Sequence, residues 1–163
     1  MKIKGTAHKY GDDINTDVIY PGKYTYQQLS PEEMAEHAME DIDPEFLQKI
    51  KQGDIIVAGK NFGCGSSREQ AASCLKYAGI SAIIAKSFSR IFFRNAINFG
   101  LLAIAHPEAA EFIEDGDAVE IDSDAGILRI KNREFKFAPF PAMVQGILDA
   151  GGLIPYLKNS IGK

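Results

Sequence analysis

A glycine-rich segment between a predicted strand and a predicted helix is the feature that most constrains the fold of this chain. The apolar run 54–58 has the length of a strand, and residues 69–78 are helix formers that end at Gly79, a typical C-terminal stop. Between them the segment 59–70 reads GKNFGCGSSREQ. It brings two serines and an arginine to a helix N-terminus, where free backbone N–H groups and the helix dipole favour an anion.

Two interpretations of this segment are open. The tetrapeptide 66–69 matches a capping box, in which the serine only caps its helix. A cap needs no glycines, whereas Gly59, Gly63 and Gly65 indicate a backbone with positive φ or one that a ligand approaches closely. No Walker motif is present, and Arg68 stands where a third glycine of a dinucleotide loop would be. We therefore expect no nucleotide site here.

The length of 163 residues and the composition agree with a single domain of residues 1–163. The net charge is −4 and the basic residues are scattered, which argues against a nucleic-acid partner. The longest apolar runs have the length of strands, and no hydrophobic signal region follows the N-terminus. We expect no membrane span and a cytoplasmic protein.

The two cysteines, Cys64 and Cys74, are too few for a disulfide framework, and they have no metal-ligand spacing with the three histidines. We therefore expect no metal site on this chain. Cys64 lies inside the glycine-rich segment, where a packed side chain is the favoured interpretation. Its alternative, a hydrolase nucleophile, would need a histidine partner that no local motif identifies.

Strands and helices alternate along most of the chain. We expect strands at 2–9, 54–58, 81–86, 101–105, 118–122, 127–131 and 134–137, and an extended stretch at 18–20. Helices are expected to begin at Ser30, which has a capping box, at Asp43, and near residues 69, 88 and 107, with a last helical stretch at 141–158. The strands after residue 117 are separated by turn residues, which is typical of an antiparallel meander.

Four separated motifs resemble the small subunits of 3-isopropylmalate dehydratase, in the aconitase superfamily. They are residues 61–69 of the glycine-rich segment, GDDINTDVIYPG at 11–22, AKSFSRIFFRNAIN at 85–98 and AGGL at 150–153. The resemblance extends from Lys2 to Leu157. It implies an α/β fold with three layers, β/β/α, which is the swivelling domain of aconitase carried on its own chain.

The resemblance also implies a reaction and roles for individual residues. The family interconverts 2-isopropylmalate and 3-isopropylmalate by dehydration and rehydration, a step of leucine biosynthesis, with one iron of a [4Fe–4S] cluster acting as Lewis acid. Ser66 would be the base, as an alkoxide stabilised by the helix N-terminus and Arg68. Ser67 and Arg68 would hold a substrate carboxylate, and Asp17 would line the same site. A purely structural role for Asp17, as an acceptor for backbone donors of its loop, is open.

The resemblance implies that a second chain is needed. An aconitase-type cluster is held by three cysteines, and this chain has two. The cluster is therefore expected on a large partner subunit, in a heterodimer or heterotetramer that takes a small dicarboxylate substrate. A regulatory or structural binding module of the same fold is the alternative. The intact Ser-Ser-Arg run favours the enzyme.

Substrate choice is expected to depend on a specificity loop after Pro21-Gly22. Relatives that take citrate or homoaconitate carry an arginine in this loop, whereas this chain has Tyr24, Thr25, Tyr26 and Gln27, with Tyr26 at roughly the arginine's place. A neutral, aromatic pocket favours an alkyl group over a second buried carboxylate. Lys23 could supply a cation instead. Related dehydratases acting on dimethylmalate or homoaconitate stay open as alternatives.

Overall fold

The computed structural model describes residues 1–161, so the last two residues of the predicted domain, 162 and 163, lie outside the described residues. The strands are β1 Lys2–Lys9, β2 Ile55–Ala58, β3 Ala82–Ala85, β4 Leu102–Ala105, β5 Ala118–Asp122, β6 Ile127–Ile130 and β7 Arg133–Lys136. The helices are α1 Thr16–Ile19, the 3₁₀ turn η1 Gly22–Tyr24, α2 Pro31–Ala35, α3 Phe46–Lys49, α4 Glu69–Tyr77, α5 Arg90–Asn98, α6 Pro107–Phe112, α7 Ala142–Asp149 and α8 Leu153–Ile161.

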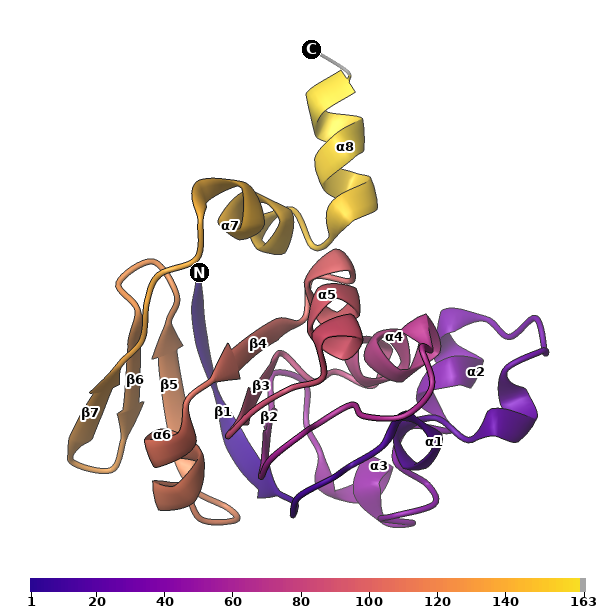
Figure 1. Ribbon diagram of the computed structural model, residues 1–163, viewed down its shortest axis with the longest axis horizontal. Coiled ribbons are helices and arrows are strands. Elements are labelled where there is room, and N and C mark those ends of the chain that lie inside the picture. Colours follow the sequence, from indigo (N-terminus) through magenta and orange to yellow (C-terminus); the bar gives the residue numbers. More distant parts are fainter. Residues whose placement is uncertain (162–163) are drawn as a thin grey trace.

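Strand β1 joins a parallel half of the sheet to an antiparallel half. The order of the seven strands is β4-β3-β2-β1-β5-β6-β7. Residues 7–9 of β1 pair with β2 in parallel, whereas residues 2–6 pair with β5 in antiparallel register. Strands β5, β6 and β7 form the predicted meander. Because one strand serves both halves, the sheet bends at β1 (Figure 1).

Alternation of apolar side chains along the parallel strands creates the three layers. Ile56 of β2 and Ile83 of β3 belong to the core under α4 and α5, while their neighbours Ile55 and Ile84 belong to the core shared with β5, β6 and β7. The parallel strands are therefore buried on both faces, as their continuous apolar runs require. Helices α4 and α5 cover one face, and the antiparallel strands, with α6 and α7 beside them, cover the other (Figure 1). The predicted β/β/α architecture is confirmed.

Most predicted elements are present within one or two residues of the expected bounds. The capping box at Ser30 is present: its hydroxyl accepts from the N–H of Glu33, and the Glu33 carboxylate accepts from the N–H of Ser30. The stretch predicted as helical from 141 to 158 is two helices. Gly151 and Gly152, with φ of 83° and 135°, separate α7 from α8.

Two local predictions were wrong, and one of the open interpretations is excluded. Residues 18–20 are not all extended, because the Asn15 side chain accepts from the N–H groups of Asp17 and Val18 and thereby starts the short helix α1. The helix expected from Asp43 begins at Phe46. The capping box that was one of two open interpretations at Ser66 is absent, since α4 begins at Glu69 and its N-cap is Arg68, whose side chain makes no capping hydrogen bond.

Candidate functional site

Two of the motifs lie against each other at one edge of the sheet. Because β1 and β2 are parallel neighbours, the loops that follow them leave the sheet at the same edge. Gly63 N donates to the carbonyl of Ile14 (2.7 Å), and Thr16 N donates to the carbonyl of Cys64 (2.8 Å). The hydroxyl of Thr16, which is buried, donates to the carbonyl of Ser66 (2.9 Å). The loop that carries the two serines is thus held by its backbone.

Packing within the chain accounts for two of the loop glycines. Gly63 has a φ of 76°, and a Cβ added there would lie 2.2 Å from Cγ of Phe92. A Cβ at Gly59 would lie 1.8 Å from Oδ1 of Asp12. The positive φ expected in this loop is confirmed, and Gly65 also has one, at 93°. At Gly59 and Gly63, however, the space is filled by side chains of this protein, so these glycines give no indication of a ligand.

Arg68 connects the serine loop to the two loop segments that follow β1. Its guanidinium forms an ion pair with the carboxylate of Asp17. The arginine side chain is 19% exposed, and the aspartate side chain is 57% exposed. A Cβ at Gly22 would lie 3.2 Å from both terminal nitrogens of Arg68, so the guanidinium also packs against the start of the specificity loop. The structure therefore brings Arg68 and Asp17 together.

Ser66 and Ser67 lie on the surface beside this ion pair. Both residues are exposed, and among residues 1–161 their hydroxyls make no hydrogen bond. The N-terminus of α4 follows at Glu69. The Ser-Ser-Arg run thus presents two free hydroxyls beside one paired guanidinium. None of its three residues lines the cavities of about 820 Å³ and 550 Å³ found elsewhere on the described chain.

The specificity loop places its two tyrosines differently. The Tyr24 ring stacks on His37, with centroids 3.6 Å apart, and Tyr26 is 97% exposed. Glu40 accepts from His37 Nδ1 (2.9 Å) and lies 3.0 Å from Lys23 Nζ. Burial opposes the charge on Glu40, but hydrogen bonds from His37 and Lys23 outweigh it and hold the pKa of this carboxyl below its ordinary value.

Thr25 and Gln27 complete the loop. The Thr25 hydroxyl is buried and has no hydrogen-bond partner among the described residues. The Gln27 side-chain amide donates to the carbonyl of Lys23 (3.2 Å), which closes the loop on itself. Neither sequence reasoning nor the resemblance singled out His37, Glu40 or Thr16. Of these, only Thr16 lay inside a recognised motif.

The two cysteines lie in different environments. Cys64 is partly exposed in the serine loop, where residues 15 and 64 form a parallel bridge. Cys74 is buried in α4, and burial raises the pKa of its thiol. Among residues 1–161, no group of three or more His, Cys, Asp or Glu side chains is arranged to hold a metal ion. No helix in that range combines the length and apolarity that crossing a membrane requires.

Comparison with known proteins shows the family of the chain. Residues 2–109 match the model of the aconitase C-terminal domain. The chain is 53% identical to the 3-isopropylmalate dehydratase small subunit of Caldicellulosiruptor saccharolyticus, over 100% of this chain and 95% of that protein. It is also 53% identical to the small subunit of that name from Caldanaerobacter subterraneus, over 98% of this chain and 99% of that protein. The chain belongs to the family of 3-isopropylmalate dehydratase small subunits.

A solved structure of the same family has the same fold. It is 3-isopropylmalate dehydratase (LeuD) from Methanocaldococcus jannaschii, with a TM-score of 0.89 at 53% sequence identity, covering 98% of this chain and 95% of that chain. The name "small subunit" in the family implies a large partner subunit.

Proposed function

We propose that this chain is the small subunit of a heteromeric hydro-lyase that interconverts 2-isopropylmalate and 3-isopropylmalate in leucine biosynthesis. The observation that carries the proposal is the Ser-Ser-Arg run, in which two exposed serines lie beside an arginine that pairs with Asp17, next to a specificity loop without arginine. Family membership at 53% identity over the whole chain supports it. The large subunit would complete the site, in a heterodimer or a heterotetramer.

The described residues do not fit an iron–sulfur cluster. One cysteine is in the loop, the other is buried in α4, and no third is present. We therefore place the [4Fe–4S] cluster on the large subunit, where it would supply the Lewis acid for the hydroxyl that leaves or returns. The chemistry of the small subunit is then acid–base work and binding of the substrate.

In this proposal Ser66 removes the proton from the carbon next to the hydroxyl-bearing carbon. A carbon–carbon double bond forms as the hydroxyl departs, and readdition of water in the opposite sense gives the isomer. An alkoxide needs a positive field, which Arg68 and the nearby N-terminus of α4 supply. Arg68 would also be able to bind a carboxylate of the substrate. Its present partner, the Asp17 carboxylate, is exposed, and a substrate carboxylate would displace it from the guanidinium.

Ser67 and Arg68 would hold that substrate carboxylate, with the guanidinium making two parallel hydrogen bonds. Asp17 would orient the guanidinium before the substrate arrives and line the site afterwards. The ion pair between Asp17 and Arg68 supports this orienting role for Asp17.

The specificity loop supports an alkyl group over an additional carboxylate. Lys23, the one cation among loop residues 23–27, already has a carboxylate partner in Glu40 and lies 4.9 Å from the centroid of the Tyr24 ring. Tyr26, exposed in the chain alone, offers an apolar ring that a bound substrate and the partner would cover. Burial of an isopropyl group against such a ring is favourable, whereas an unpaired carboxylate there would be costly.

The experiment that tests the proposal is reconstitution. The purified chain is mixed anaerobically with its cognate cluster-bearing large subunit and assayed with isopropylmalate, dimethylmalate, citrate and homocitrate. We expect turnover of isopropylmalate at the highest kcat/KM, and neither turnover nor stoichiometric iron in the isolated chain. Preference for dimethylmalate would move the assignment to that dehydratase, and an inactive but correctly assembled complex would indicate a non-catalytic module.

A further inference from the structure

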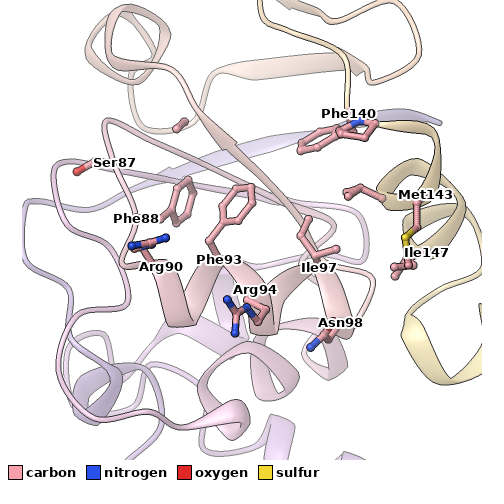
Figure 2. Close-up of a pocket in the computed structure, with 13 residues that line it drawn as sticks. Ser87, Phe88, Arg90, Phe93, Arg94, Ile97, Asn98, Phe140, Met143 and Ile147 are labelled. Carbon is pink, nitrogen blue, oxygen red and sulfur yellow. The ribbon is translucent and has the colours of Figure 1, made fainter.

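A large groove runs along α5, on the side that faces α7. Its volume is about 820 Å³. The floor consists of apolar side chains, and Figure 2 shows Phe88, Phe93 and Ile97 projecting from one wall towards Phe140 and Ile147 on the other. Neither the resemblance nor the proposed chemistry gives this groove a role.

Two arginines at the groove carry charges that no acidic side chain of residues 1–161 neutralises. Arg90 and Arg94 are four residues apart and therefore share one face of α5. Both are exposed, and among residues 1–161 neither forms an ion pair. No acidic side chain lines the groove. Its best occupant therefore combines an apolar side chain with neighbouring carboxylates.

On the opposite wall an apolar side chain is left in water. Met143 of α7 lines the groove and is 63% exposed. A flexible thioether at the edge of an apolar groove is typical of a surface that another protein covers. The arginines and this methionine thus mark the two rims of one contact surface.

The groove begins at the candidate site. The segment before α5 is tied to the serine loop by a hydrogen bond from Asn61 N to Ser87 Oγ (2.8 Å), and a second runs from Ser89 Oγ to the carbonyl of Gly63 (2.7 Å). Phe62 and Phe88 form a parallel bridge between the two segments. A partner that covers the serine loop would therefore meet the end of the groove at Ser87 and Phe88.

We propose that this groove is a docking surface for the cluster-bearing large subunit, which inserts an apolar side chain between α5 and α7 and places carboxylates against Arg90 and Arg94. The inference rests on the proposed function, because the need to cover the serine loop is what brings the large subunit to this face. Hydrophobic burial would supply affinity, and the arginines would supply steering and register.

The test measures the dissociation constant between the full-length chain and the purified large subunit by isothermal titration calorimetry under anaerobic conditions. The variants are Arg90→Glu/Arg94→Glu and, separately, Met143→Asp, at exposed positions where substitution leaves the core intact. Lys51→Glu/Lys136→Glu is the control. It changes the net charge equally at exposed lysines outside the groove.

We expect each groove variant to weaken binding at least tenfold, with the control within twofold of wild type. At a large-subunit concentration above the weakened dissociation constant, kcat should return, because none of these residues is in the reacting site. Wild-type affinity in both groove variants, with unchanged circular dichroism, would overturn the docking surface. So would wild-type affinity with a lost kcat, which would mean that a small ligand occupies the groove.

The binding measurement decides the docking surface and the turnover of the wild-type complex decides the proposed function, so the two can fail separately.

Discussion

Replacing Gly63 by alanine tests whether the serine loop is shaped by packing inside the chain. The φ of 76° costs a residue with a Cβ about 1–2 kcal/mol. The new Cβ would also lie 2.2 Å from Cγ and 2.3 Å from Cβ of Phe92. Phe92 is 1% exposed, and its ring packs against Phe62 at 5.1 Å, so it has little room to move. Overpacking of this kind costs about 1–3 kcal/mol. We expect Gly63→Ala to lower the free energy of unfolding by about 2–5 kcal/mol.

Urea denaturation of the chain, followed by circular dichroism, measures this loss. Gly11→Ala is the matched control, because a Cβ there has no heavy atom within 4 Å and the backbone is not at positive φ. It should change stability by less than about 1 kcal/mol. If Gly63→Ala were as stable as Gly11→Ala, the loop would have room for a side chain, and close approach of a ligand would be the better reason for the glycine.

Three further predictions concern the site and the sheet. Arg68→Lys should raise KM strongly in steady-state assays of the complex, because lysine cannot make a bidentate carboxylate contact; an unchanged KM would remove Arg68 from the substrate. Tyr26→Arg should raise the ratio of kcat/KM for a homoaconitate-type substrate over isopropylmalate at least tenfold, about 1.4 kcal/mol, and a constant ratio would show that Tyr26 does not face the substrate. Burial opposes the charge of Asp54, but His8 Nε2 at 2.8 Å and two backbone N–H groups hold its pKa below the ordinary value. Its stabilising effect is therefore complete above about pH 4 and is lost as the pH falls through the lowered pKa, so Asp54→Asn should destabilise the chain at pH 7 and less so in acid unfolding experiments.

Local patterns predicted most of the elements that local forces decide. The Ser30 capping box and the apolar strands were correct, because caps and short buried runs depend on neighbouring residues. The start of α1 was missed because the Asn15 side chain accepts hydrogen bonds from the N–H groups of Asp17 and Val18, an effect that strand propensity does not include. The three-layer arrangement came from the resemblance and not from periodicity, since runs such as Ile55–Ala58 do not reveal which layers cover their faces.

The site was predicted in its residue types but not in its contacts. Arg68 and Asp17 are 51 positions apart in the sequence, and their ion pair follows only once β1 and β2 are known to be parallel neighbours. Two contacts of the specificity loop also depend on tertiary folding. Tyr24 stacks on His37 and Lys23 pairs with Glu40 only after α2 and the turn that follows it have folded back on the loop. No spacing pattern in the sequence carries that information.

The central claim, that Ser66 is the base of an interfacial site, is tested most directly by the single-turnover rate of Ser66→Ala in the reconstituted complex. The Ser66 side chain makes no capping hydrogen bond in the structure, so its loss should leave the free energy of unfolding within about 0.5 kcal/mol of wild type. We predict a fall in the rate of at least about a hundredfold, with the dissociation constant of the complex unchanged. A variant that keeps most of the wild-type rate, with the complex fully assembled, would contradict the account.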